Sequence, residues 1–294
     1  MNKNLRTLLA VLLALCLVLG LAACKAKAPV EESAAPSEEP TAPVVENPTI
    51  RLSTTTSVND SGLLPYLQPV FEADTGYKLE ISSAGTGAAI EKGRTGDADA
   101  LLVHAKASEE EFISQGYADE RIPFMYNYFV IVGPKDDPAG VKSCANASEA
   151  FKKIAEGKYT FISRGDDSGT HKAELKIWDA AGLKPSGDTD PWYISAGAGM
   201  GDCLNMAEEK QCYILTDKAT FLSRKDTIEI LLEKSDEMKN TYSMLVISPE
   251  KWPDTNEAGA KAFVEWMLSD KAKELINAYG VEEFGQQLFF TIDK

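Results

Sequence analysis

Histidine and cysteine are scarce in this sequence, and positive charge is in deficit. The two histidines, His104 and His171, lie far apart, and no Cys or His spacing is typical of zinc, so no protein-coordinated metal is expected. The 30 Lys and Arg stand against 45 Asp and Glu, which gives a formal net charge of -15. Nucleic acid and anionic membrane surfaces are therefore poor candidate partners.

The cysteines do not form a complete disulfide framework. Of the five cysteines, Cys16 and Cys24 fall in the N-terminal segment, which leaves Cys144, Cys203 and Cys212. An odd number leaves two alternatives open: Cys203 pairs with Cys212 in an oxidising compartment, or all three are buried free thiols.

Residues 1–23 have the pattern of a signal peptide. Lys3 and Arg6 precede an apolar run over residues 8–21, which is short for a spanning helix because such a helix needs roughly 20 apolar residues. The run ends in Leu-Ala-Ala-Cys, which resembles the lipobox of bacterial lipoproteins. The resemblance implies that Cys24 is acylated and becomes the mature N-terminus. An ordinary signal peptide cleaved after Ala23, or an uncleaved anchor, is the alternative.

Residues 24–48 indicate a lipidated, disordered stalk. The segment is rich in Pro, Ala and Glu and has no apolar periodicity. It cannot bury enough surface to offset the entropy lost on ordering. The folded body is therefore expected to begin near Thr49.

The body alternates apolar strand patterns with amphipathic helix patterns. This alternation is typical of an α/β fold with a parallel sheet and helices on its faces. The expected strands are 49–53, 79–82, 98–103, 129–133, 160–163, 192–194, 212–215 and 241–247. The expected helices are 63–71, 88–92, 148–155, 173–181, 257–268 and 270–279, with one more after Gly201. Two similar runs of strand–turn–helix units predict two lobes, with lobe I at 49–127 and 242–294 and lobe II at 128–241.

Three turns between a strand and a helix are rich in Ser, Thr and Gly. They are residues 54–57, residues 82–87 and residues 164–170. Open α/β sheets bind ligands at the carboxyl ends of their strands, and a helix N-terminus there offers free N–H groups and partial positive charge. Hydroxyls add donors without added charge. Arg164, at the start of the third turn, adds a planar fork that can grip two oxygens of an anion. These turns predict an anion site, with Asp166 and Asp167 holding the arginine.

Two other interpretations of these residues are weaker. The Gly-rich segment 197–201 lacks the context of a nucleotide-binding loop, and it either supplies backbone donors from the second lobe or forms a tight turn. Ser168, with His171 three residues later, or Cys203 could serve as a nucleophile, but no G-x-S-x-G elbow is present. We expect no catalysis, a rim position for His171 and a structural role for His104.

The body resembles the periplasmic-type substrate-binding proteins of ABC importers for oxyanions, and among them the tungstate-binding (TupA-type) lipoproteins. The matching segments are residues 54–57, 60–64, 85–87, 96–104, 125–127, 129–134, 163–171 and 199–201. The resemblance implies a two-lobed periplasmic-binding-protein-like α/β fold, each lobe a mostly parallel sheet with helices on both faces, closing on a ligand in the cleft. The oxyanion ligands that it implies, with Thr55 included from the first turn, are Thr55, Thr56, Ser57, Thr86, Arg164, Ser168, Gly169 and Thr170.

The same resemblance implies the ligand and the partners. Tungstate is the expected ion, and an ABC permease is the expected membrane partner. The protein is expected to be a monomer without cofactor that meets the membrane only through Cys24, on the extracytoplasmic face. Tungstate, molybdate and sulfate are unprotonated dianions at neutral pH, whereas phosphate carries protons and favours a carboxylate acceptor. The first two turns contain no acidic residue, which favours the dianions. Molybdate, sulfate or phosphate binding, or an enzyme or signalling ectodomain on this fold, remain alternatives.

Overall fold

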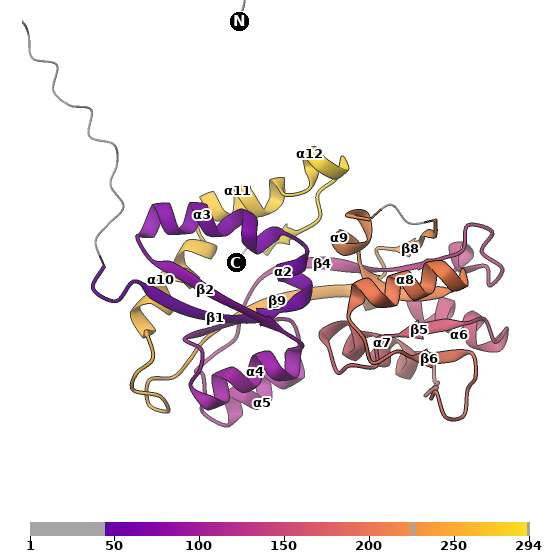
Figure 1. Ribbon diagram of the computed structural model, residues 1–294, viewed down its shortest axis with the longest axis horizontal. Coiled ribbons are helices and arrows are strands. Elements are labelled where there is room, and N and C mark those ends of the chain that lie inside the picture. Colours follow the sequence, from indigo (N-terminus) through magenta and orange to yellow (C-terminus); the bar gives the residue numbers. More distant parts are fainter. Residues whose placement is uncertain (1–44, 225–226, 293–294) are drawn as a thin grey trace, which may run out of the picture. The chain divides into compact units, whose positions relative to one another are not determined.

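The computed structural model describes residues 45–224 and 227–292. The predicted signal peptide, Cys24 and most of the predicted stalk lie outside this part of the chain. Residues Ala42–Lys294 group as one compact unit. Figure 1 shows its strands running through the middle of the unit with helices on either side.

The strands and helices alternate along most of the chain. The strands are β1 (Thr49–Thr55), β2 (Lys78–Ala84), β3 (Ala100–Val103), β4 (Ile122–Gly133), β5 (Phe161–Ser163), β6 (Tyr193–Ser195), β7 (Tyr213–Asp217), β8 (Glu229–Glu233), β9 (Lys239–Val246) and β10 (Phe290–Thr291). The helices are α2 (Thr56–Asp60), α3 (Leu63–Thr75), α4 (Thr86–Thr95), α5 (Lys106–Ser114), α6 (Ala147–Glu156), α7 (Gly169–Ala180), α8 (Met200–Lys210), α9 (Lys218–Leu222), α10 (Glu257–Met267), α11 (Asp270–Ala278) and α12 (Val281–Phe284). Two short 3₁₀ turns, η1 (Val141–Ser143) and η2 (Asp236–Met238), complete the set.

The strands form a mixed sheet in the order β2-β1-β3-β9-β4-β7-β5-β6. β1 pairs in parallel with β2 and β3, and β5 pairs in parallel with β6 and β7. β9 is antiparallel to both β3 and β4, because the chain returns along it after building the second group of strands. β4 joins the two groups, since its first part pairs with β9 and its last part pairs with β7. We call β1, β2, β3 and β9 the first half of the sheet, and β5, β6, β7 and β8 the second half.

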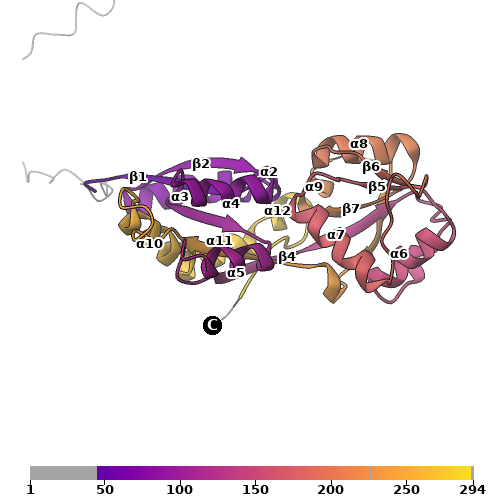
Figure 2. The same cartoon turned by 90° about the horizontal axis from the view of Figure 1, so that it is seen from below.

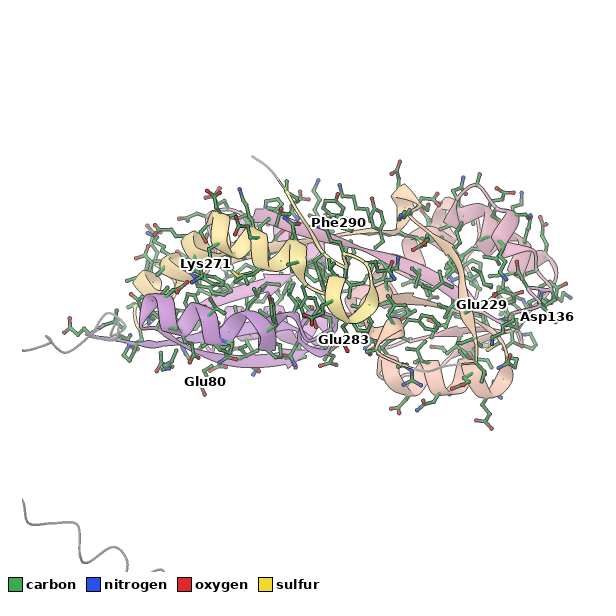
Figure 3. All side chains as sticks on the ribbon, turned by 90° about the horizontal axis from the view of Figure 1, so that it is seen from above. Glu80, Asp136, Glu229, Lys271, Glu283 and Phe290 are labelled. Carbon is green, nitrogen blue, oxygen red and sulfur yellow. The ribbon has the colours of Figure 1, made fainter. Side chains whose placement is uncertain are left out.

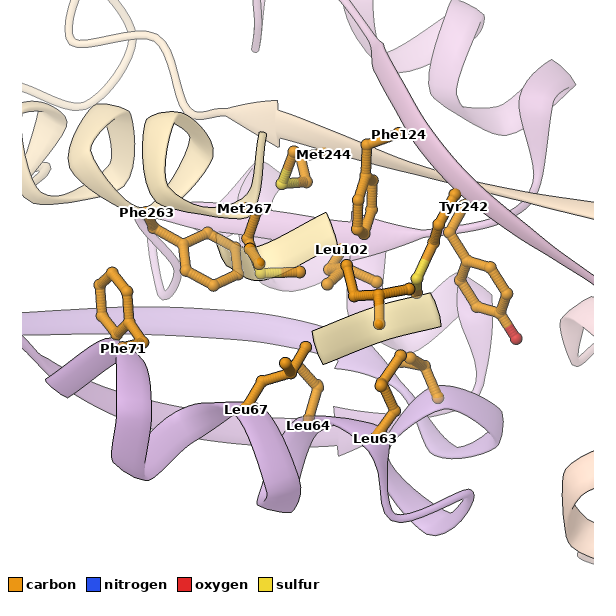
Figure 4. Close-up of a cluster of buried hydrophobic side chains, with 14 of the residues drawn as sticks. Leu63, Leu64, Leu67, Phe71, Leu102, Phe124, Tyr242, Met244, Phe263 and Met267 are labelled. Atoms are coloured by element: carbon orange, nitrogen blue, oxygen red, sulfur yellow. The ribbon is translucent and has the colours of Figure 1, made fainter. Parts of the chain in front are cut away.

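Each half of the sheet is covered by apolar side chains on both faces. In β3, Ala100 and Leu102 pack with α3 and α10, whereas Leu101 and Val103 pack with α4 and α5. This alternation follows from the two-residue repeat of a strand. Figure 4 shows the first of these clusters, in which Phe71 and Phe263 meet edge to face with ring centroids 5.5 Å apart.

The second half has the same plan. Its two clusters are centred on Phe151 and Trp178 from α6 and α7 on one face, and on Leu204 from α8 on the other. Figures 1 and 2 show α7 and α8 on opposite sides of β5–β7. The expectation of an α/β fold with helices on both faces is confirmed, but the sheet is mixed where β4 and β9 run between the halves. The residue limits of the two lobes remain a prediction.

Several local predictions need correction. The helix expected from Leu63 is preceded by a separate short helix, α2, over residues 56–60, and Gly62, at φ 85°, is its N-cap. The third turn is shorter than predicted. Helix α7 begins at Gly169 rather than Ala173, because the Ser168 side chain accepts a hydrogen bond from His171 N and caps it. Helix α5 was not predicted.

The surface of the described residues is acidic. Glu80, Asp136 and Glu283 point outward in Figure 3, and all three are exposed. Every helix in the described ranges is too short or too polar to cross a bilayer.

Candidate functional site

The end of β1 supplies three hydroxyls with different roles. Thr54 is fully buried and its Oγ1 donates to the carbonyl oxygen of Leu102 at 2.8 Å, so this hydroxyl is structural. Thr55 Oγ1 lies 3.1 Å from Ser57 Oγ, and Ser57 Oγ lies 2.9 Å from Nε2 of His104. The predicted residue Thr56 is half-buried and lies between them in sequence.

Thr86 begins helix α4 and is fully buried, with 0% of its surface exposed. Gly85, the N-cap, has no side chain that could cap the helix. The Thr86 Oγ1 has no hydrogen-bond partner. A buried hydroxyl without a partner costs about 1–3 kcal/mol, so the Oγ1 of Thr86 is available to a ligand.

Arg164 follows β5 and is 6% exposed. Its Nη2 donates to Oδ2 of Asp166 at 2.5 Å, as predicted, while its buried Nε has no partner. The turn can form because Gly165 adopts a φ of 61°, which favours glycine, and a Cβ there would lie 2.0 Å from Ser195 Oγ. The guanidinium is therefore held in place through Nη2, and its buried Nε–H is unused.

Helix α7 begins with the other predicted ligands of the third turn. Ser168 is 3% exposed, and its hydroxyl accepts from His171 N at 3.2 Å as the N-cap. Thr170 is 2% exposed and its Oγ1 has no hydrogen-bond partner. Thr86, Arg164 and Thr170 thus share one property, an unpaired buried polar atom that can donate.

The structure brings Thr56, Ser57 and Arg164 to one cavity of about 240 Å³. The other residues that line it are Asp60, Gly199, Met200, Gly201, Asp217 and Thr220. The Gly-rich segment therefore does lie at the site. It is held there by backbone hydrogen bonds from Ala196 N to Ser163 O at 2.9 Å and from Ala198 N to Arg164 O at 3.2 Å. Gly199 caps α8 without a side-chain hydrogen bond.

The other predicted residues lie around this cavity without lining it. Gly169 lines a second cavity of about 540 Å³, together with His104 and the lysines of α5 and α7. Thr55, Thr86, Ser168 and Thr170 line neither of these two cavities. The second and third turns nevertheless meet, because a Cβ on Gly87 would lie 3.2 Å from Asp167 Oδ2.

The residues at the site that were not predicted include His104 and Asp217. His104 follows β3 and bonds to Ser57, although the sequence indicated only a structural role. Asp217 ends β7, lines the cavity and caps α9 by accepting from Thr220 N at 2.9 Å. Burial raises the pKa of Asp217, partly offset by its hydrogen bonds to Thr220 and the charge of Arg164. Both residues lie at the carboxyl ends of strands. Open α/β sheets bind ligands at these ends, so the reasoning that identified the three turns could also have identified these two residues.

The charge of the third turn is largely balanced within the turn. Burial raises the pKa of Asp166, but hydrogen bonds from Ser168 and the charge of Arg164 outweigh it, so the pKa is lowered overall. Asp167 lies 3.2 Å from Lys172 Nζ. Neither carboxylate is an unpaired acceptor.

The arrangement does not provide a catalytic pair. The Nδ1 of His171 accepts from Asp167 N at 3.1 Å, and Ser168 contacts the backbone of His171 rather than its ring. Burial raises the pKa of Cys203 to about 11, so it is a poor nucleophile. Cys144, Cys203 and Cys212 are free thiols. No group of acidic, His or Cys side chains suited to a metal ion occurs in the described residues.

Comparison with known proteins gives the family. A model of the PBP superfamily domain matches residues 37–271. The tungstate-binding protein TupA of Peptoclostridium acidaminophilum is 49% identical over 244 residues, which are 82% of this chain and 84% of that protein. The chain belongs to the PBP superfamily, in the family of the TupA proteins.

Two solved structures support the same family. The tungstate-binding protein TupA from Desulfovibrio alaskensis G20 is 37% identical with a TM-score of 0.74, over 84% of this chain and 100% of that one. The tungstate ABC transporter structure from Geobacter sulfurreducens is 40% identical with a TM-score of 0.72, over 79% and 98%. The family resemblance seen in the sequence is confirmed. TupA proteins are binding proteins rather than enzymes, so the expectation that the chain is not an enzyme is also confirmed.

Proposed function

We propose that this protein captures a tetrahedral oxyanion, tungstate, and delivers it to an ABC importer. The observation that carries the proposal is the set of buried, unpaired polar atoms on predicted ligands: Thr86 Oγ1, Thr170 Oγ1 and Arg164 Nε. All three can donate a hydrogen bond. An oxyanion, which has only acceptor oxygens when unprotonated, satisfies them together.

The cavity lining contains one arginine and two carboxylates, Asp60 and Asp217, so a dianion there would be held mainly by neutral donors. Arg164 is the cation of the cavity lining, and its Asp166 partner already neutralises part of its charge. The remaining donors are hydroxyls and backbone N–H groups at the starts of α4, α7 and α8, where the helix dipole adds partial positive charge. We assign Thr55, Thr56, Ser57, Thr86, Arg164, Ser168, Gly169 and Thr170 to the oxyanion site, with Thr55 and Ser168 holding their neighbours.

Tungstate, rather than another dianion, is proposed from the relatives. The three relatives described above carry tungstate in their names, and one of them is 49% identical to this chain. One observation favours a competing ligand. Asp217 lines the cavity, and a carboxylate there could accept a proton from hydrogen phosphate.

The direct test is isothermal titration of the processed protein with tungstate, molybdate, sulfate and phosphate in one phosphate-free buffer. We expect tight tungstate binding and weak phosphate binding. Tight phosphate or molybdate binding with weak tungstate binding would replace the transported ion. Binding of none of the four would reject the proposal.

We further propose the two-lobe division at residues 127–128 and 241–242, with closure around the ion. The apolar clusters support it, because two draw mainly on residues before Asn127 and after Asn240, and two draw on residues between them. Small-angle X-ray scattering with and without tungstate tests closure. A smaller radius of gyration with the ion is expected, and an unchanged radius would contradict closure.

Binding proteins of this family work outside the cytoplasmic membrane with a membrane permease. We propose that this one is tethered through acylated Cys24 and is a monomer. The large hydrophobic side chains exposed in the described ranges, Tyr66, Leu175 and Val281, belong to separate helices, which supports a monomer. Mass spectrometry of the N-terminal peptide tests the acylation, and light scattering tests the oligomeric state.

A further inference from the structure

Asp217 is a buried carboxylate in the lining of the cavity that holds Arg164. It ends β7, and only 1% of its surface is exposed. The other carboxylate in that lining, Asp60 of α2, is exposed to solvent. The cavity is small, about 240 Å³, so an ion held in it lies close to Asp217.

The charge of Asp217 depends on Arg164. Burial raises the pKa of Asp217 and is the largest influence, whereas its hydrogen bonds to Thr220 and the charge of Arg164 lower it. The hydrogen bond from Thr220 N to Oδ1, at 2.9 Å, caps α9 and belongs to the fold. Arg164 is already paired with Asp166 at 2.5 Å. The attraction of Arg164 is therefore the part of this balance that a bound anion changes.

The charged groups on the neighbouring helices do not replace Arg164. Asp60 in α2 and Asp202 in the first turn of α8 are exposed carboxylates, so they add negative charge around Asp217. Lys218 follows Asp217 at the start of α9, but its ammonium group pairs with Glu233 of β8.

The titratable groups on the other side of Asp217 are neutral at neutral pH. Burial raises the pKa of Tyr242, on β9, and the charge of Asp217 raises it further. Burial lowers the pKa of His104, which follows β3, to about 4. Neither side chain supplies a positive charge that could keep Asp217 ionised beside an anion.

A dianion in the cavity reverses the balance at Asp217. Its charge offsets the attraction of Arg164 and adds a repulsion of its own. Like charges held close together in a site of low dielectric do not all stay ionised, and the group that can take up a proton does so. An unprotonated oxyanion such as tungstate is a weak base, so that group is the carboxylate.

We propose that capture of the oxyanion is coupled to the uptake of one proton by Asp217. The proton comes from the solvent and binds Oδ2, because Oδ1 already accepts from Thr220 N. The inference rests on the proposed oxyanion function. It explains how a lining with one arginine and two carboxylates accepts a dianion. Because the proton is held more tightly in the complex than in the free protein, affinity falls as pH rises.

The first test counts the protons. Tungstate is titrated into the processed protein in a calorimeter, in several buffers that differ in ionisation enthalpy. The slope of the observed enthalpy against the ionisation enthalpy gives the number of protons taken up. At about pH 8 we expect the wild type to take up about one proton per ion. Binding without proton uptake would overturn the proposal.

The second test removes the acceptor. Asp217→Asn cannot titrate, and it keeps the cap of α9 because Asn is as good an N-cap as Asp. We expect no uptake in this variant. Between about pH 7 and 9 its affinity should stay constant, whereas that of the wild type should fall by up to about tenfold per pH unit. Equal uptake and equal pH profiles in the two proteins would overturn the proposal.

Three control variants remove the other groups that could take up a proton near the site. They are Asp60→Asn in the cavity lining, His171→Gln at the start of α7, and Glu174→Gln, whose parent carboxyl has a pKa that burial raises to about 7. We expect each control to keep the uptake of the wild type. Loss of the uptake in one of them would assign the proton to that residue instead of Asp217.

The outcomes separate this inference from the function beneath it. A wild type that binds no oxyanion rejects the proposed function. A wild type that binds tungstate without taking up a proton rejects the role of Asp217 alone. If Asp217→Asn does not fold, infrared difference spectra of the Glu174→Gln variant decide. Tungstate should then produce the carbonyl stretch of a protonated carboxylic acid, and binding without that band would overturn the proposal.

Discussion

Arg164 Nη2 lies 2.5 Å from Asp166 Oδ2, and this contact leaves the Nε of the same guanidinium buried without a partner. Asp166 also accepts from Ser168 N at 3.2 Å through its other oxygen. One carboxylate therefore fixes both the arginine and the start of α7. The arginine is oriented before any ion arrives, which lowers the entropy lost on binding.

Replacing Arg164 should abolish tight oxyanion binding without unfolding the protein. Arg164→Ala removes every guanidinium donor, and Arg164→Lys keeps the charge but loses the planar fork and Nε. We expect Arg164→Lys to weaken binding about 10- to 100-fold, because hydrogen bonds to charged groups contribute about 1.5–3 kcal/mol. The control is Arg94→Lys on α4, whose partner is Glu111 at 3.6 Å. Wild-type affinity in Arg164→Lys would contradict the assigned role.

Replacing either Thr86 or Thr170 by Val should weaken ion binding and, at the same time, stabilise the ligand-free protein. Thr→Val removes the unpaired hydroxyl at nearly constant volume, so each variant should bind the ion about tenfold more weakly. Without ligand, each should be more stable by on the order of 1 kcal/mol, because a buried unsatisfied hydroxyl is gone.

The matched control for these threonines is Thr54→Val. Thr54 Oγ1 donates to Leu102 O at 2.8 Å, so this variant should lose stability and keep its affinity. Titration calorimetry and urea unfolding measure the two quantities. If Thr86→Val and Thr170→Val are destabilised without ligand, their hydroxyls are structural rather than ligand-binding.

Gly169→Ala should impair binding through His104. The added methyl would lie 2.1 Å from His104 Cε1 and the buried ring would have to move, taking Nε2 away from Ser57. Gly85→Ala is the control, because a Cβ there meets no atom within 4 Å. We expect weaker tungstate binding in Gly169→Ala and unchanged binding in Gly85→Ala. Equal affinities would show that the ring position does not matter to the ion.

Glu174 should make stability depend on pH. This side chain in α7 is 2% exposed, and its Oε1 accepts from Tyr193 at 2.7 Å and from Trp178 at 3.0 Å. Burial raises its pKa to about 7, against its hydrogen bonds. Because the folded pKa is raised, the stabilisation is present below the unfolded pKa and is lost as pH rises through 7.

Glu174→Gln keeps the acceptor oxygen and removes the titration. Between pH 5 and pH 8 the wild type should lose roughly 3 kcal/mol of unfolding free energy relative to this variant. Urea unfolding at both pH values measures the difference. Parallel pH dependence in the two proteins would mean that Glu174 is ionised in the fold already at low pH.

Most of the fold was predictable because the strands are short apolar runs bounded by clear turns. β5 and β7, for example, lie within about two residues of their predicted positions. Helix α5 was missed because its Ser and Glu residues show little apolar periodicity, with Phe112 as its main buried anchor. The antiparallel pairing of β9 depends on where the chain returns, which no local pattern reveals.

The site was predictable from residue chemistry only in outline. Hydroxyls and glycines at strand ends pointed to the three turns, and Arg164 stood out by its charge. Sequence could not reveal which hydroxyls were already used, as Thr54 is by Leu102 O. Nor could it place His104 against Ser57, because that contact joins residues 47 positions apart through the pairing of β1 with β3.

We propose that the unpaired donors of Thr86, Arg164 and Thr170 converge on one oxyanion. The most direct measurement is the crystal structure of the processed protein grown with tungstate, with diffraction data at an absorption edge of tungsten. We expect one anomalous peak, with the oxygens of that tungstate ion within hydrogen-bond distance of Arg164 Nε and the two threonine hydroxyls. A peak among the lysines of the 540 Å³ cavity, or no ordered tungsten at all, would contradict it.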